Sequence, residues 1–133
     1  MALVQQLILW EGKGSWVVDN KVRRGASAET DAARMLVDAG YRIVDRNFRC
    51  KAGELDIVAR DGEVLVFIEV RSRSDDEHGS AVEMIRHAKQ RQVARVATYY
   101  LATVQPVFEE CRFDIVAITA GEAILIKDAF RIR

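Results

Sequence analysis

The chain has 133 residues, of which half are apolar and 30% are charged, with 20 basic and 20 acidic side chains. This length corresponds to one domain, and the composition excludes collagen-like, low-complexity and intrinsically disordered proteins. A formal net charge of zero disfavours a protein that is cationic over its whole surface, although it allows a local basic patch.

The positions of the cysteines and the length of the apolar runs exclude further classes of protein. The two cysteines, Cys50 and Cys111, belong to no CxxC pair, so we expect neither a disulfide scaffold nor a zinc finger. No apolar run is long enough to span a membrane, and the N-terminus lacks the features of a signal peptide. These features predict a cytoplasmic protein with no membrane partner.

The chain is expected to begin with an extension, residues 1–24, followed by a single domain over residues 25–133. We expect the extension to be helical in part and to cover an apolar surface. Apolar residues at helical spacing then predict a helix from Ser27 to about Ala39. Gly40 stands where a left-handed C-cap belongs.

Three strands are predicted next, over residues 41–48, 54–60 and 63–71. The dipeptide Asp61-Gly62 is a strong signal for a two-residue hairpin loop between the second and third of them. The third strand is mostly apolar, which is typical of a central strand covered on both faces.

A long helix and two more strands complete the predicted order. The capping-box pattern Ser80-Ala81-Val82-Glu83 predicts a helix from Ser80 to about Thr103. Strands are expected over residues 111–119 and 122–127. The order predicts an α/β domain with a mixed sheet flanked by helices, because the long helix returns the chain to a strand that can lie parallel.

Two carboxylates fall where the pattern predicts buried positions. With Asp61-Gly62 as the loop, Asp56 is expected opposite Phe67, and Glu54 opposite Glu69. Asp56 and Glu69 are then diagonal neighbours, about 7–8 Å apart at the backbone.

The electrostatic repulsion between two such carboxylates has to be offset by another interaction. Two carboxylates about 5 Å apart repel by roughly 3 kcal/mol at an effective dielectric constant of 20. The pair persists if one acid is protonated, if a cation bridges the two, or if arginines neutralise them. All-oxygen ligation favours Mg²⁺ or Mn²⁺ over zinc.

Three further charged residues occupy positions due to be apolar, namely Glu29, Arg71 and Lys89. Taken singly, each has a structural explanation. Glu29 suits a helix start, Arg71 can neutralise Glu69, and Lys89 can extend to water. Asp56 and Glu69 differ, because the hairpin brings them together and no single partner neutralises both.

The stretch GELDIVA from Gly53 and the stretch FIEVRSR from Phe67 resemble the D…ExK core of the PD-(D/E)xK nuclease superfamily. More closely, the chain resembles the YraN-like family of endonuclease-like proteins. The other matching pieces are Gly25–Glu29, Gly40-Tyr41, Arg46-Asn47, Arg112–Val116 and Lys127–Phe130. The resemblance implies a restriction-endonuclease-like fold with an αβββαβ core.

The resemblance also implies roles for individual residues. Asp56 and Glu69 would bind Mg²⁺ or Mn²⁺, with the backbone carbonyl of Val70 as a further ligand, and Glu29 would be the acid of the first helix. Arg71 would join these catalytic residues in place of the usual lysine. An arginine stays protonated and can only donate hydrogen bonds or stabilise charge. The implied activity is metal-dependent hydrolysis of phosphodiester bonds.

Basic residues around these motifs are expected to contact nucleic-acid phosphates. The partner implied is DNA rather than RNA, recognised by its structure, since the sequence contains no base-reading motif. Whether the protein is a homodimer stays open. The residues expected to bind nucleic acid are Arg46, Arg49, Lys51, Arg73 and Lys89.

Two other functions remain open at this point. A nucleic-acid-binding module that kept the nuclease scaffold but lost turnover is supported by Arg71 in the lysine position. A structural or protein-interaction domain would need Asp56 and Glu69 to be locked by arginines.

Overall fold

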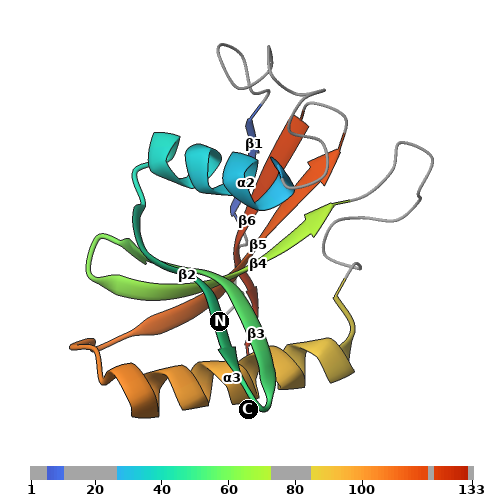
Figure 1. Ribbon diagram of the computed structural model, residues 1–133. Helices are drawn as coiled ribbons and strands as arrows, with labels where there is room; N and C mark the ends of the chain where they lie inside the picture. The colour runs from blue at the N-terminus through green and yellow to red at the C-terminus, as the bar shows by residue number, and fades with distance from the viewer. Residues whose placement is uncertain (1–5, 11–26, 73–84, 120–121, 132–133) are drawn as a thin grey trace, which may run out of the picture.

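The computed structural model describes residues 6–10, 27–72, 85–119 and 122–131. In this part of the chain, one mixed sheet of six strands has α2 on one face and α3 on the other (Figure 1). The strand order is β1-β6-β5-β4-β3-β2, with β4 and β5 parallel and the other neighbours antiparallel. The bounds are β1 (Gln6–Trp10), α2 (Ser27–Asp38), β2 (Arg42–Cys50), β3 (Gly53–Asp61), β4 (Val64–Ser72), α3 (His87–Val104), β5 (Cys111–Thr119) and β6 (Glu122–Phe130).

The predicted α/β class and the αβββαβ order are confirmed, and they give the arrangement expected of a restriction-endonuclease-like fold. The strand predicted over residues 111–119 is found with the same bounds, whereas β6 runs three residues further than predicted. The described part of residues 1–24 is a strand, not a helix. This strand, β1, pairs with β6 at one edge of the sheet. No helix in the described ranges is long and apolar enough to cross a membrane.

The end of α2 is fixed by Gly40, as the sequence predicts. Gly40 has a φ of 98°, and its N–H donates to the Val37 carbonyl at 3.0 Å. The Tyr41 N–H donates to the Leu36 carbonyl at 2.9 Å, which completes a Schellman motif. The motif turns the chain directly into β2.

The loop between β3 and β4 differs from the prediction. The loop residues are Gly62 and Glu63, and Asp61 pairs with Val64 as the last pair of the ladder. Gly62 has a φ of 63°, so the glycine supplies the left-handed conformation at the first loop position. The loop therefore lies one residue further along the chain than Asp61-Gly62.

The register of β3 and β4 is consequently shifted by two residues. Val58 lies opposite Phe67, not Leu65, and Ile57 lies opposite Ile68. The predicted pairs of Asp56 with Phe67 and of Glu54 with Glu69 are wrong. A shift of two preserves the side-chain alternation, because residues two apart face the same way.

The helix α3 begins later than predicted. It starts at His87, and Arg86 at the N-cap has an extended backbone without a side-chain capping bond. The predicted capping box at Ser80–Glu83 lies outside the described residues. Ile85, just before the helix, is buried in the core and accepts a hydrogen bond from the Gln90 side chain. The chain is thus anchored by burial before α3 begins.

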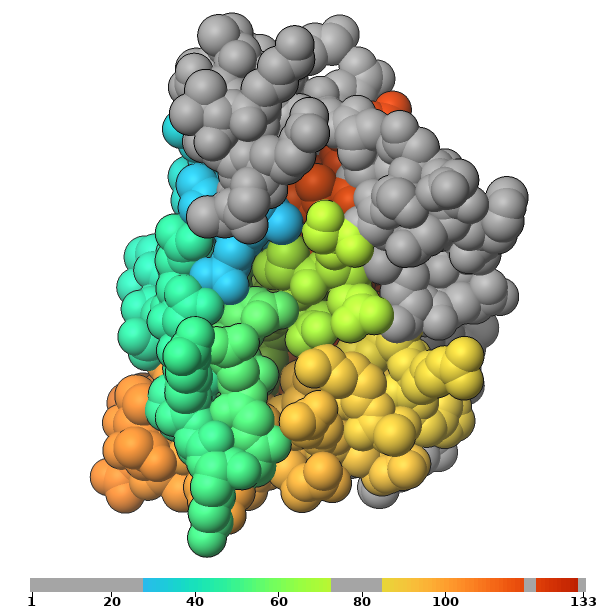
Figure 2. Space-filling view, turned by 45° about the vertical axis from the view of Figure 1, so that its right-hand side comes forward, coloured from blue at the N-terminus to red at the C-terminus, as the bar shows by residue number. Residues whose placement is uncertain are grey.

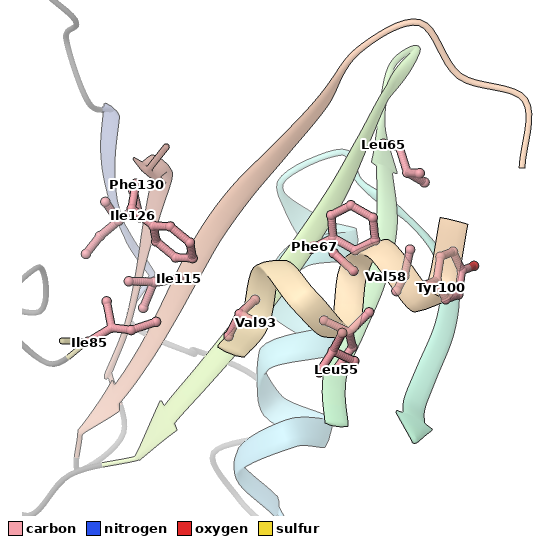
Figure 3. Close-up of a cluster of buried hydrophobic side chains, with 13 residues drawn as sticks. Leu55, Val58, Leu65, Phe67, Ile85, Val93, Tyr100, Ile115, Ile126 and Phe130 are labelled. Atoms are coloured by element: carbon pink, nitrogen blue, oxygen red, sulfur yellow. The ribbon is translucent and has the colours of Figure 1, made fainter. Parts of the chain in front are cut away.

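Two apolar layers hold the helices to the sheet. The layer under α3 is the larger and is rich in aromatic rings (Figure 3). Tyr100 meets Phe67 and Phe48 edge-on, with ring centroids 5.9 and 5.1 Å away. The layer under α2 includes Met35, Leu36 and Ile68. Complete burial of each such large side chain contributes about 1.5–3 kcal/mol.

The β2–β3 hairpin is irregular next to Asp56. Leu55 and Val58 both pack in the layer under α3, whereas Ile57 packs in the layer under α2. Strict alternation would send Leu55 and Val58 to opposite faces. Asn47, which stands across from Asp56 between two regular pairs, has a φ of 58°. The hairpin therefore changes face at the level of Asp56.

A buried polar network joins several parts of the sheet around Asp114. The Asp114 carboxylate is fully buried and accepts hydrogen bonds from the Tyr41 hydroxyl at 2.6 Å and the Arg112 guanidinium at 2.9 Å. It also accepts the Asp128 backbone N–H at 2.9 Å. Arg112 extends to Asp61 at 2.8 Å, so the network ties β3, β5 and β6 to Tyr41, the residue before β2. Burial and the neighbouring Asp114 raise the pKa of Tyr41 far above its ordinary value.

Removal of the Asp114 carboxylate should destabilise the fold. In Asp114→Ala the Arg112 charge and the Tyr41 hydroxyl lose a buried partner, so the free energy of unfolding in urea is expected to fall by about 3 kcal/mol. Arg131→Ala is the control, because the ion pair of Arg131 with Asp128 is exposed. An Asp114→Ala protein as stable as the wild type would contradict the structural role of the network.

Two glycine substitutions should differ in their effects on stability. Gly53 has a φ of 140°, and an added Cβ would lie 2.8 Å from Gln92 Nε2 and 3.2 Å from Val96. Gly62 has a left-handed φ but nothing within 4 Å of an added Cβ. We expect Gly53→Ala to cost more than about 2 kcal/mol and Gly62→Ala about 1 kcal/mol in urea unfolding. Equal losses would show that the hairpin tip is not tightly packed on α3.

Candidate active site

Four elements meet around the end of β4. Figure 2 looks onto this face, where the exposed part of β4 lies between α2, the β2–β3 hairpin and the start of α3. Each element contributes charged side chains that the sequence pattern singled out, namely Glu29 from α2, Asp56 from β3, Glu69 and Arg71 from β4, and Lys89 from α3.

Asp56 is held by the neighbouring strand. The last regular pair of β3 and β4 is Ile57 with Ile68, so Asp56 and Glu69 occupy the next positions. The backbone N–H of Val70 donates to Asp56 Oδ2 at 2.8 Å. Among the described residues no donor reaches Oδ1, which leaves that oxygen available to a ligand.

The pKa of Asp56 is raised above its ordinary value. Burial is the largest cause, and the negative charges of Glu29 and Glu54 add to it. The Val70 N–H and the Lys89 charge oppose the rise without cancelling it. The site therefore resists a second uncompensated negative charge.

Glu69 is the more deeply buried of the two acids, with only 6% of its surface exposed. Its Oε2 lies 3.5 Å from Arg71 Nη1 and 3.8 Å from Lys89 Nζ. Burial, followed by the charge of Asp56, raises the pKa of Glu69 to about 7, and the two cations limit the rise. Near neutral pH, Glu69 is therefore divided between its charged and uncharged forms.

The flanking acids have their own basic partners. Arg46 Nη2 lies 3.4 Å from Glu29 Oε1 and 3.3 Å from the Thr30 hydroxyl, which ties β2 to the start of α2. Arg49 Nε lies 2.6 Å from Glu54 Oε2 across the hairpin. Within the described part of the chain, Asp56 alone of these acids has no basic side chain within 4 Å.

The structure gathers most of the predicted site residues but pairs them in unpredicted ways. Glu29, Asp56, Glu69, Arg71 and Lys89 surround one site. Of the residues expected on phosphates, Arg46, Arg49 and Lys89 contact carboxylates, Lys51 lies over the Tyr99 ring, and Arg73 lies outside the described residues. Sequence analysis missed Tyr99 and the Gln92 side chain at the hairpin tip. The sequence signal that could have revealed them is their spacing: Gln92 and Tyr99 are seven residues apart and each directly precedes a buried residue of α3.

The donor set fits a hard divalent cation. Among the described residues, no group of three or more His, Cys, Asp or Glu side chains is placed to hold a metal ion. Zinc sites need three or four such ligands, whereas Mg²⁺ is commonly bound by one or two carboxylates, with water and substrate phosphate completing the shell. Asp56 and Glu69 supply two carboxylates, and a cation would relieve the repulsion that raises their pKa values.

Comparisons with known proteins place the chain in a family. Residues 28–118, which include both acids, match the family described as "Uncharacterised protein family UPF0102". The chain belongs to this family. The YraN-like membership inferred from the motifs is thereby confirmed.

Proteins of this family from several organisms are similar to this chain over most of its length. A UPF0102 protein of Lachnoclostridium phytofermentans is 46% identical over 112 residues, covering 84% of this chain and 95% of the relative. One from Moorella thermoacetica is 48% identical over 96 residues, covering 72% and 80%. One from Hahella chejuensis is 48% identical over 92 residues, covering 69% and 74%. Their names state no activity, so function has to be inferred from the site.

Burial of Glu69 should make stability depend on pH. Its pKa is about 7 in the folded protein against an ordinary 4.5, so the folded state keeps a proton that the unfolded chain releases between these values. Stability is therefore expected to fall as the pH rises from about 4.5 through 7, by on the order of 3 kcal/mol.

Urea unfolding at pH 5 and pH 8 in metal-free buffer measures this effect. Glu69→Gln should remove most of the difference between the two pH values, whereas Glu63→Gln, in the exposed loop of the same hairpin, should preserve it. An unchanged pH dependence in Glu69→Gln would show that the carboxyl is not buried against Asp56.

Proposed function

We propose that this protein is a Mg²⁺- or Mn²⁺-dependent endonuclease that hydrolyses phosphodiester bonds in DNA. The observation that carries this proposal is that Asp56 and Glu69 face each other one step beyond the last regular pair of β3 and β4, in a site that disfavours two uncompensated negative charges. The resemblance to the D…ExK core supports the same reading.

Asp56 and Glu69 would hold the ion, together with the backbone carbonyl of Val70. When bound, such an ion lowers the pKa of a coordinated water and stabilises charge on phosphate oxygens. The Val70 N–H restrains Asp56 Oδ2 and leaves Oδ1 for coordination. Glu29, at the start of α2, adds negative charge beside Asp56 and would stabilise a cation there.

Arg71 and Lys89 supply positive charge beside Glu69. Arg71 remains protonated, so its role is to bind and stabilise the scissile phosphate rather than to accept a proton. Lys89 approaches Glu69 from α3, whereas Arg71 lies with Glu69 on β4. The two cations thus reach the same carboxylate from different elements, and both are partly exposed to an incoming phosphate.

The substrate would be bound through its backbone. Arg46, Arg49 and Lys51 lie along the β2–β3 hairpin, and Arg46 and Arg49 would exchange their partners Glu29 and Glu54 for phosphates when the substrate binds. Contacts of this kind give affinity that falls with salt and carry little sequence information. We infer recognition of DNA structure rather than of base sequence.

A second function is favoured by one specific observation. Arginine occupies the position of the usual lysine, and Arg71 Nη1 lies 3.5 Å from Glu69 Oε2. A nucleic-acid-binding module that lost turnover would have this feature. Binding without cleavage would support it.

A cleavage assay tests the proposed function. Purified protein is incubated with branched, nicked, flapped and single-stranded DNA in Mg²⁺ or Mn²⁺. We expect metal-dependent cleavage that falls by at least about 100-fold in Asp56→Asn and in Glu69→Gln, because each removes a negative ligand.

Glu63→Gln is the matched control, since Glu63 lies on the same hairpin at the far loop, and it should cleave like the wild type. Cleavage that persists in Asp56→Asn would contradict the assignment. Binding of these substrates without cleavage in any metal would favour the non-catalytic module.

A further inference from the structure

One flank of α3 is basic and carries an exposed aromatic ring. Residues 87–104 contain no Asp or Glu. Arg91, Arg95 and Tyr99 recur every four residues, so they lie one above another on the helix. All three are exposed, and Tyr99 has 38% of its surface accessible.

The tip of the β2–β3 hairpin extends this surface. Lys51 Nζ lies 5.9 Å from the centroid of the Tyr99 ring, within the range of a cation–π contact. Gln92 Nε2 donates to the Ala52 carbonyl at 3.3 Å, and Gly53 packs directly on Gln92 and Val96. The hairpin tip is therefore docked on α3. The surface formed by Lys51, Arg91, Arg95 and Tyr99 is called the α3 platform below.

The charge around Tyr99 distinguishes it from the other exposed aromatic residue. Among the residues whose side-chain exposure the structure describes, Tyr99 and Phe108 are the exposed Phe, Tyr or Trp residues, at 38% and 37%. Phe108 follows the C-terminal end of α3 and lines a hollow with three acids, Glu63, Glu109 and Glu110, and one cation, Arg60. Tyr99 instead has cationic neighbours on two elements. The two rings therefore have similar exposure but different charged surroundings, cationic around Tyr99 and mainly acidic around Phe108.

An exposed ring among cations suits one class of ligand. Single-stranded nucleic acids are bound by basic grooves that follow the phosphates and by aromatic rings on which bases stack. In a duplex the base faces are already stacked on one another, so a surface ring offers nothing to them. We propose that the α3 platform binds a single-stranded segment of polynucleotide, with Lys51 and Arg95 on phosphates and Tyr99 against a base.

This inference rests on the proposed function, because it assigns the platform to the substrate of the same site. Lys51 precedes Asp56 by five residues on one hairpin, so their backbones are no more than about 18 Å apart. One strand can therefore lie on the platform and reach Asp56 and Glu69. The implied substrate has a single-stranded branch, flap or end next to the bond that is cut.

Binding without metal tests the platform separately from cleavage. Fluorescence anisotropy of the full chain in EDTA is measured with a labelled single-stranded DNA, the RNA of the same sequence, and the DNA duplex. Tyr99→Ala should weaken binding of the single strand by about 5- to 100-fold, the range of one lost stacking contact. Tyr99→Phe should bind like the wild type, and Tyr99→Ala should change duplex binding little.

Phe108→Ala is the matched control and should leave every affinity unchanged. Lys51→Ala should reduce the salt dependence of single-strand binding by about one counterion. A loss in Tyr99→Ala with both DNA and RNA supports a general platform, and a loss with one of them supports that polynucleotide as the ligand.

Other results would overturn the proposal: no single-strand binding by the wild type, unchanged binding in Tyr99→Ala, or an equal loss in Phe108→Ala. Tyr99-dependent binding by a protein that cleaves nothing would leave the platform standing and reject the nuclease. Cleavage by the wild type, together with unchanged single-strand binding in Tyr99→Ala, would reject the platform and leave the nuclease standing.

Discussion

The contact between Asp56 and the backbone N–H of Val70 determines where the two acids of the site stand. It joins β3 and β4 one step beyond their last regular pair, where the hairpin changes face beside Asn47. A slip of one residue in this ladder would turn Asp56 to the other side of the sheet. The two-residue loop at Gly62 and Glu63 fixes the register of this ladder at its other end, where Asp61 pairs with Val64. The geometry of the site therefore depends on a register fixed about five residue pairs away.

Two buried carboxylates make opposite contributions to stability. Asp114 is buried and accepts hydrogen bonds from Tyr41, Arg112 and the Asp128 N–H. Glu69 is buried beside Asp56 with its pKa raised, which means that its charge opposes folding near neutral pH. Arg71 and Lys89 offset part of this cost. Strain of this electrostatic kind is tolerated because the apolar layers and the Asp114 network hold the scaffold.

Periodicity and turn chemistry were sufficient for most of the fold. The C-cap at Gly40 and the strand over residues 111–119 follow from local signals that no distant contact overrides. The β3–β4 register was off by two, since Asp61-Gly62 is a strong loop signal but Gly62 takes the first loop position. The error left Asp56 and Glu69 on neighbouring positions, because a shift of two preserves alternation.

The unpredicted features all depend on contacts between distant residues. Asn47 adopts a left-handed backbone opposite Asp56, and nothing in the local sequence requires it. Arg46 and Arg49 find carboxylate partners on α2 and β3, although their spacing suggested a row of phosphate ligands. Only the geometry shows that, among the acids of the site, Asp56 has no basic side chain within 4 Å in the described part of the chain.

Calorimetric titration of Mn²⁺ into the metal-free protein tests most directly whether these acids form a metal site. One ion should bind, with an affinity that rises from pH 6 to pH 8 as Glu69 loses its proton. The affinity should be lost in Asp56→Asn and kept in Glu63→Gln. The absence of binding by the wild type, or equal binding by Asp56→Asn, would contradict a metal site at Asp56 and Glu69.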